Sequence, residues 1–216
     1  MQKKSIIVSI IIAAVIIVDQ AVKFWVKTNM SYGADFPILG QSWAYIHFVE
    51  NEGMAFGLKL GGSYGKLALS LFRLAAVGFL IYFLRRLIKE GASMGVLVSF
   101  ALIIAGALGN IIDSAFYGLI FSESLVHGSP AEFLPEGGGY AGFLFGKVVD
   151  MFYFPMIDTI LPEWVPFIGG SRFEFFKPVF NVADSAICVG VAILLIFQRS
   201  FFKKEEEVQP QIEGES

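Results

Sequence analysis

Two pairs of polar residues stand inside long apolar stretches, at a spacing that would bring the members of each pair together on a helix. Asn181 and Asp184 lie three residues apart in PVFNVADSAICVGVAILLIFQ, a run of membrane-spanning length. Asn110 and Asp113 repeat the N-x-x-D-S pattern in GALGNIIDS. Because a carboxylate in hydrocarbon is costly, we expect both pairs to point inward, toward a partner, a cavity or a reaction.

Asp150 is a further candidate, since apolar and aromatic residues flank it in GKVVDMFYFP and such a setting raises the pKa of a carboxyl group. The residue types leave three chemistries open. Two neighbouring carboxyl groups can act as acid and base on water. Asp113, Asp150 and Asp184 could instead bind Mg²⁺ in a membrane transferase. The two Asn/Asp pairs could also form the ion site of a small transporter built as an inverted repeat.

Two shorter motifs lie nearer the N-terminus. In DQAVK, Asp19 and Lys23 are four residues apart and can form an ion pair on a helix. From this motif alone, the simpler interpretation is an anchor at the membrane interface beside Trp25. In NEGMAFG, Asn51 offers an amide, and Gly53 allows the backbone to come close to a substrate.

The composition is that of an integral membrane protein. Of the 216 residues, 56% are hydrophobic and 16% are charged, and the mean hydropathy is +0.68. We predict an all-α integral membrane protein, a bundle of four transmembrane helices with a small β-containing extracytoplasmic subdomain whose strands fall in SWAYIHFVENEGMAFG. The expected spans are about 5–26, 67–84, 94–112 and 179–197.

Basic residues predict the orientation of this bundle. Lysines or arginines precede the first span, fill the short link 85–93 and follow the last span, so both termini should be cytoplasmic. The longer connections then face outward and carry insertions at about 114–147 and 156–177. We expect residues 1–200 to form a single membrane domain and residues 201–216 to be a disordered cytoplasmic tail.

The motifs DQAVK, NEGMAFG, GALGNIID, VVDMF and FNVAD, in this order, resemble lipoprotein signal peptidase, also called signal peptidase II, over about residues 5–199. The resemblance implies an aspartic endopeptidase of the bacterial inner membrane. Such an enzyme removes the signal peptide from a diacylglyceryl-modified prolipoprotein, on the N-terminal side of the lipidated cysteine. We expect this substrate and membrane lipids as partners, a monomer, and no cofactor, metal or nucleic acid.

The resemblance also implies roles for individual residues. The V-x-D-F-like and F-N-x-A-D motifs carry the catalytic carboxylates of the family, which match Asp150 and Asp184. Positions that bind substrate match Asn51, Gly53, Asn110 and Asn181, and supporting positions match Asp19, Lys23 and Asp113.

Two features depart from the family pattern. The family usually has Arg after the G-N-x-x-D aspartate, where this chain has Ser114, and we consider Lys147 or Arg172 as its substitute. Insertions rather than short links also separate the catalytic motifs. We expect these insertions to extend the outward-facing part over the site, as a lid or a substrate guide.

A pair of carboxyl groups would supply the hydrolytic chemistry without a Ser, Cys or metal nucleophile. One carboxylate activates a water molecule, and its protonated partner donates to the carbonyl oxygen or the leaving amine. Like charges this close do not both ionise easily, so the two pKa values separate and the shared proton belongs to the pair. We therefore expect the active site just beneath the outer surface of the membrane, where the lipid-modified substrate arrives.

Overall fold

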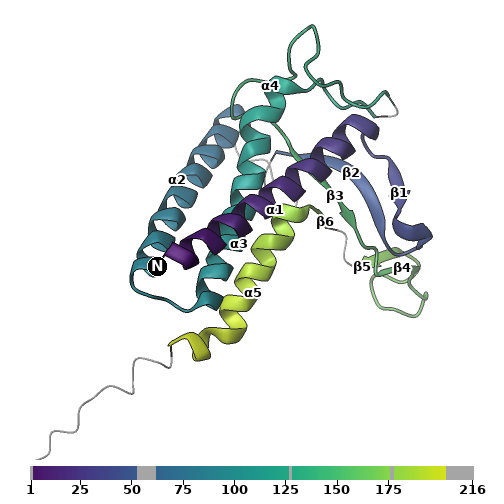
Figure 1. Cartoon of the computed structure of the whole chain (residues 1–216). Helices are drawn as coiled ribbons and strands as arrows, with labels where there is room; N and C mark the ends of the chain where they lie inside the picture. The colour runs from purple at the N-terminus through teal and green to yellow at the C-terminus, as the bar shows by residue number, and fades with distance from the viewer. Residues whose placement is uncertain (1, 53–61, 127, 176–177, 203–216) are drawn as a thin grey trace, which may run out of the picture.

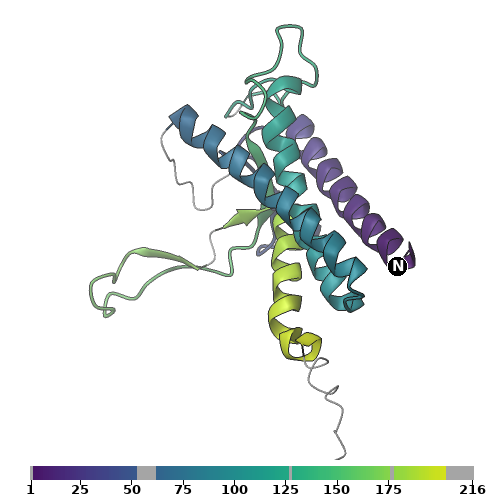
Figure 2. The same cartoon turned by 90° about the vertical axis from the view of Figure 1, so that its left-hand side faces the viewer.

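The computed structural model describes residues 2–52, 62–126, 128–175 and 178–202. A bundle of long helices holds a small β-sheet against one of its ends (Figures 1 and 2). Helix α3 occupies the middle of the bundle and packs against α1, α2 and α5. The helices are α1 (Gln2–Asn29), α2 (Gly62–Lys89), α3 (Met94–Ile112), a π-helical turn (Asp113–Tyr117), α4 (Gly118–Ile120) and α5 (Val182–Phe202).

The described helices support a membrane protein, although they do not confirm four spans. Helices long and apolar enough to cross a membrane are Gln2–Asn29, Tyr64–Lys89 and Met94–Ile120, whereas the apolar part of α5, Val182–Phe197, is shorter. The prediction of a helix from residue 179 is wrong at its start. Val179–Phe180 forms strand β6, and α5 begins only at Val182.

The predicted third span, 94–112, has the bounds of α3, and helical structure continues beyond it through the π-helical turn to Ile120. A π-helical turn widens the helix and leaves backbone groups in need of partners. The returning insertion provides them. The amides of Gly146 and Ala141 donate to the carbonyls of Ser114 and Gly118, at 2.8 and 2.9 Å.

The main sheet is antiparallel, with strand order β1-β2-β3-β6. The expected strand in SWAYIHFVENEGMAFG is confirmed by β2, and the VVDMF motif lies on β3 beside it. A separate two-stranded sheet is formed by β4 and β5. The strands are β1 (Asp35–Pro37), β2 (Tyr45–Asn51), β3 (Val148–Tyr153), β4 (Ile157–Ile160), β5 (Arg172–Phe175) and β6 (Val179–Phe180), and a 3-10 turn (Ile38–Gly40) follows β1.

Two apolar cores hold these layers together. One lies where the far end of α1, the π-helical turn and the main sheet meet, and includes Val26, Phe48 and Met151. The other lies between α1, α2 and α3, and includes Leu97 and Ile104. The site described below is therefore built where the helical bundle meets the sheet.

Small residues allow α3 and α5 to approach closely. A Cβ atom added at Gly106 would overlap the backbone carbonyl oxygen of Ala183, which a side-chain rotation cannot relieve. We expect Gly106→Ala to lower the free energy of unfolding by about 1–3 kcal/mol. Thermal unfolding of the purified protein in detergent measures this effect.

The matched control is Gly78→Ala on α2, where the added methyl group meets no atom within 4 Å. It should be neutral or slightly stabilising, because alanine favours helix more than glycine does. Equal unfolding temperatures for the two variants would contradict close packing between α3 and α5.

Candidate active site

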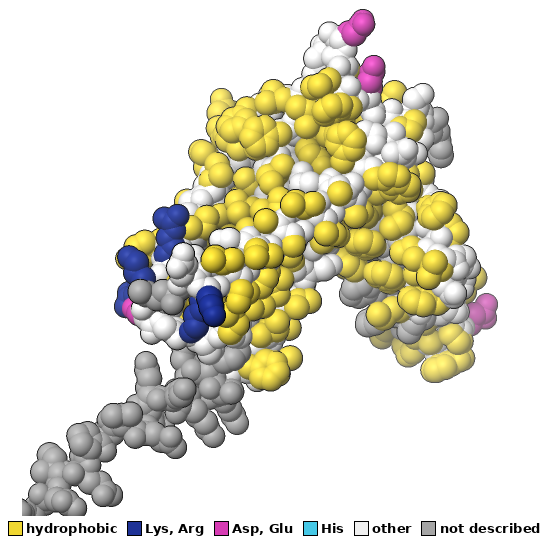
Figure 3. Space-filling view, viewed as in Figure 1, with side chains coloured by type: hydrophobic (Ala, Val, Ile, Leu, Met, Phe, Trp, Pro, Cys, Tyr) yellow, Lys and Arg dark blue, Asp and Glu magenta, His cyan; other side chains and the backbone are white. Residues whose placement is uncertain are grey.

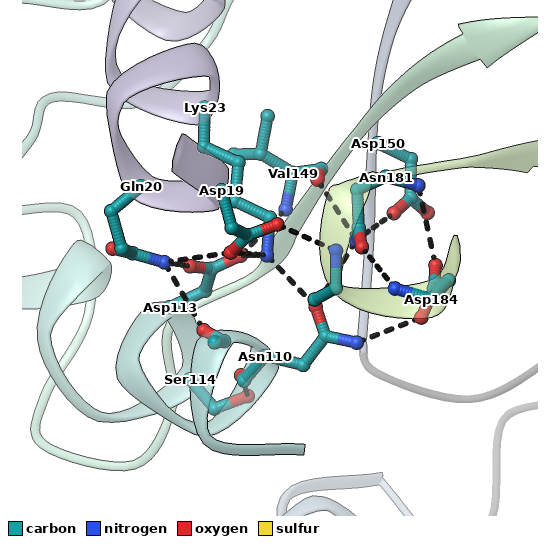
Figure 4. A network of polar contacts seen from close by, with 12 residues as sticks. Asp19, Gln20, Lys23, Asn110, Asp113, Ser114, Val149, Asp150, Asn181 and Asp184 are labelled. Carbon is teal, nitrogen blue, oxygen red and sulfur yellow. Dashed lines mark hydrogen bonds and ion pairs between the residues drawn. The ribbon is translucent and has the colours of Figure 1, made fainter. Parts of the chain in front are cut away.

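Lys23 is the centre of a buried polar network between the helices (Figure 4). Its side chain is 0% exposed, and its Nζ lies 2.9 Å from Asp19 Oδ2 and 2.8 Å from Asp113 Oδ2. It also donates a hydrogen bond to Asn110 Oδ1 at 2.8 Å. The predicted Asp19–Lys23 ion pair is therefore present. The interpretation of DQAVK as an interfacial anchor is wrong, because both charged groups are buried.

The two carboxylates paired with Lys23 each hold the backbone of another element. Asp113 Oδ2 accepts a hydrogen bond from the amide of Val149 on β3, at 3.2 Å. Asp19 Oδ1 accepts one from the amide of Ala183 on α5, at 2.8 Å. These amides belong to the residues directly before Asp150 and Asp184. The Lys23 network therefore fixes the backbone that carries both candidate catalytic aspartates.

Asn181 caps α5 rather than lying within it, which corrects the expected helical pairing with Asp184. Its Oδ1 accepts a hydrogen bond from the backbone amide of Asp184 at 2.9 Å. In return, Asp184 Oδ2 accepts one from the backbone amide of Asn181 at 3.4 Å. This reciprocal arrangement is a capping box, and Asn is among the preferred residues at the first position. The cap fixes the direction of the Asp184 side chain.

The amide nitrogen of Asn181 points the other way, to β3. It donates to Asp150 Oδ1 at 2.7 Å and to the carbonyl of Val149 at 3.3 Å. Asn51 on β2 donates to the other Asp150 oxygen. On the Asp184 side, Asn110 Nδ2 donates to Asp184 Oδ1 at 2.8 Å. Figure 4 shows Asp150, Asn181 and Asp184 together at one end of the network.

Burial distinguishes the two candidate aspartates. Asp150 is 4% exposed, whereas Asp184 is half-buried. Burial, followed by the negative charge of Asp184, raises the pKa of Asp150 to about 7. The positive charge of Lys23 and the amide donors of Asn181 and Asn51 act in the opposite direction. Asp150 therefore keeps its proton to a much higher pH than an ordinary aspartic acid.

Most of the residues chosen from the sequence meet in this one region. Gly53 lies outside the described residues. Sequence reasoning missed Gln20, whose Nε2 bridges Asp113 Oδ1 at 2.8 Å and Asp19 Oδ2 at 3.1 Å. Its position inside DQAVK was the available signal. The residues brought together are Asp19, Lys23, Asn51, Asn110, Asp113, Asp150, Asn181 and Asp184.

The repeated N-x-x-D-S pattern is not a structural repeat. Asn110 lies within a helix, whereas Asn181 caps one. Asp113 faces Lys23, and Asp184 faces Asn110. Among the residues that the structure describes, no group of three His, Cys, Asp or Glu side chains is placed to hold a metal ion. The two pairs therefore do not form the inverted repeat on which the transporter alternative was based.

The known contacts of Lys147 and Arg172, the two substitutes considered for the family arginine, do not place either residue beside Asp184. Ser114 is buried and donates to the carbonyl of Asn110 at 3.1 Å. Lys147 pairs with Glu123 at 3.5 Å, and Arg172 is exposed on β5. A basic residue on which the negative charge of Asp184 does act is Arg73 of α2. The signal for it was a charged side chain within an apolar span.

A second buried ion pair fixes the first insertion. Lys27, on the turn of α1 that follows Lys23, pairs with Glu50 of β2 and donates to Ser124 Oγ at 2.9 Å. Its Nζ also lies 5.0 Å from the ring centroid of Tyr140. The insertion is thereby tied to α1 and to the strand that carries Asn51.

The comparisons with known proteins agree with one another. The family model for Signal peptidase (SPase) II matches residues 11–200. A lipoprotein signal peptidase of Porphyromonas gingivalis is 52% identical over 196 residues, which cover 88% of this chain and 81% of that protein. A lipoprotein signal peptidase of Amoebophilus asiaticus is 36% identical over 188 residues, covering 86% and 74%.

A solved structure of a bacterial membrane enzyme shares the fold. It superposes with a TM-score of 0.57 at 25% sequence identity, and the match covers 94% of each chain. Apolar helices beside a small sheet, a buried polar site where they meet, and a family match over most of the sequence lead to one conclusion. This chain belongs to the signal peptidase II family and is a membrane peptidase.

Proposed function

We propose that Asp150 and Asp184 are the catalytic pair with which this signal peptidase cleaves the signal peptide from a diacylglyceryl-modified prolipoprotein. The observation that carries the proposal is the position of Asn181 between them. One end of its amide group donates to Asp150, and the other end accepts from the backbone of Asp184. A single buried side chain therefore sets the relative position of both carboxyl groups.

In the proposed reaction, the pair enters the cycle with one proton and binds a water molecule. The ionised carboxyl group takes a proton from this water as its oxygen attacks the scissile carbonyl carbon. The protonated partner donates to the carbonyl oxygen, and a tetrahedral intermediate forms. Its collapse breaks the C–N bond: the pair protonates the leaving amine of the lipidated cysteine, and a hydroxyl group of the intermediate returns its proton to the pair. Asn51, Asn110 and Asn181 hold the two carboxyl groups and their substrate in register.

We also propose that both termini face the cytoplasm of a bacterial inner membrane, with the site near the outer leaflet. Lys and Arg side chains gather at the end of the bundle that holds the N-terminus and the link between α2 and α3 (Figure 3). Lys4 of α1 donates there to the carbonyls of Gly91 and Ala92, at 3.0 and 2.6 Å. The excess of basic residues on one side supports this orientation. The catalytic pair lies toward the opposite end.

A gel-shift assay tests this function. The purified chain, reconstituted in lipid nanodiscs, is incubated with a prolipoprotein that carries the diacylglyceryl group, and with the same protein whose lipid-accepting cysteine is replaced by serine. We expect cleavage of the lipidated substrate only, and no loss of activity in the presence of a chelator. Equal cleavage of both substrates would contradict the substrate assignment. Loss of activity on chelation would favour the Mg²⁺ chemistry instead.

The pH dependence of cleavage follows from the pKa of Asp150, which is raised to about 7. Above that pH the pair loses its shared proton, so kcat/KM should fall about tenfold per pH unit. Asn51→Ala removes a donor that favours the ionised form of Asp150. The alkaline limb of its profile should therefore move to higher pH. A profile that stays flat well above neutral pH would refute the assignment.

A further inference from the structure

Strands β4 and β5 are joined by a connection that exposes large apolar side chains. The two strands pair antiparallel, with Ile157 opposite Phe175 and Ile160 opposite Arg172. Trp164 is 81% exposed and Phe167 is 106% exposed, the latter with a φ of 68°. We use the term hairpin tip for the exposed apolar residues at this end, which are Ile160, Trp164, Phe167 and Ile168.

The hairpin lies beside the helices and not beyond their outer end. In Figures 1 and 2, β4 and β5 lie at the height of α5. By contrast, part of the first insertion, which follows α4, extends beyond the ends of the long helices. Figure 3 shows the lobe at the place of β4 and β5 as largely apolar, with a recess between it and the helical body. The hairpin therefore occupies the depth of helices that are themselves built to contact lipid.

The chemistry of the connection suits this depth. Residues 161–171, LPEWVPFIGGS, contain one charged side chain, Glu163. Trp favours the boundary between headgroups and acyl chains, where its ring is apolar and its N–H stays near water. A fully exposed Phe in a left-handed backbone conformation has no advantage in water. Transfer of the ring into lipid would offset the cost of exposing it to water and the cost of this backbone conformation.

The backbone of the connection meets part of the demand of an apolar environment, where unpaired N–H groups are costly. Pro162 and Pro166 have no N–H group. The amides that donate to carbonyls within residues 161–171 are those of Leu161, Val165, Gly169, Gly170 and Ser171.

We propose that the hairpin tip inserts into the outer leaflet of the membrane that the helices cross, as a shallow lipid anchor beside α5. The hairpin lies in the chain between β3, which carries Asp150, and Asn181. The anchor thus holds the sheet side of the site at a fixed height in the bilayer. The proposal depends on the orientation given above and not on which residues are catalytic.

Tryptophan fluorescence tests the depth of the tip directly. The chain contains Trp25, Trp43 and Trp164, so the double variant Trp25→Phe/Trp43→Phe leaves one reporter. It is reconstituted in nanodiscs whose lipids carry bromine at a shallow or a deep position of the acyl chain. We expect shallow bromine to remove roughly half of the emission of Trp164, and aqueous iodide to have little effect.

Two references calibrate this result. A protein that retains only Trp25, on α1, reports a helix in the membrane. A protein without native tryptophan that carries Leu134→Trp reports water, since Leu134 is exposed in the first insertion. Iodide quenching of Trp164 equal to that of the Leu134→Trp reporter, without bromine quenching, would overturn the proposal. Bromine quenching that appears only after substrate is added would also overturn the proposal. The tip would then be a cover for the bound substrate and not an anchor of the free enzyme.

A pair of variants at Phe167 separates insertion from local folding. Phe167→Leu keeps an apolar side chain and should preserve the bromine quenching of Trp164. Phe167→Asp adds a charge at the tip and should reduce this quenching to the level of the water reporter, while cleavage of the lipidated substrate in detergent continues. Equal quenching in both variants would show that the tip does not enter lipid.

Discussion

Asp150→Asn and Asp184→Asn should each lower prolipoprotein cleavage by about 10³-fold or more. An amide cannot take a proton from water, and it cannot give one to the leaving amine. Either replacement therefore removes the shared proton on which the proposed mechanism depends. The measurement is the single-turnover rate in nanodiscs with a lipidated substrate. Turnover within tenfold of the unmodified enzyme by either variant would refute the pair.

Stability measurements distinguish this loss of chemistry from a loss of folding. The pKa of Asp150 rises from 3.8 to about 7 on folding, so its contribution to stability is full below 3.8 and is lost as the pH rises through 7. Asn carries no charge at any pH. Asp150→Asn should thus unfold at a higher temperature than the unmodified protein at about pH 8, with a smaller difference in acid.

An aspartate outside the site provides the matched control. Asp35 lies on β1, where its exposed carboxylate pairs with His47. Asp35→Asn removes the same charge from the same sheet without touching Asn181 or Asp150. It should leave cleavage unchanged, because it does not alter the site. It should also leave the unfolding temperature nearly unchanged, because exposed ion pairs contribute little to stability.

Much of the site was predictable because its residues are costly where they stand. Polar residues in apolar runs indicate Asp184, Asn110 and Asn181 from the sequence alone, since hydrocarbon tolerates such groups only with partners. The ion pair of Asp19 with Lys23 followed from helical spacing. These inferences needed only local sequence and the rules for membrane helices.

The rest depended on contacts between distant segments. The sequence of α5 does not reveal that its first residues form a strand, because Val179 and Phe180 are equally apolar in either structure. The π-helical turn at Asp113 is stabilised by backbone amides from a segment some thirty residues later, such as Gly146, and local propensity does not contain that information. Pairing with β2 likewise fixed the place of Asp150 on the sheet.

Lys23→Met should be the most destabilising single change in the helical bundle, with a loss of about 3–5 kcal/mol. The ammonium group is the buried counter-charge of Asp19 and Asp113 and also holds Asn110, which in turn donates to Asp184. Without it, two buried carboxylates face each other uncompensated. Because they fix the amides of Val149 and Ala183, we expect cleavage to fall together with the unfolding temperature.

A charge-balanced variant tests the cause of this loss. Lys23→Met/Asp113→Asn removes one positive and one negative charge, so a single buried carboxylate remains instead of two. If uncompensated charge is the cause, the double variant should unfold at a higher temperature than Lys23→Met alone, although cleavage stays low because Asn110 still lacks the hydrogen bond from Lys23. If the two variants unfold at the same temperature, lost packing rather than charge explains the effect. A Lys23→Met protein as stable as the unmodified one would show that the buried network does not hold the site together.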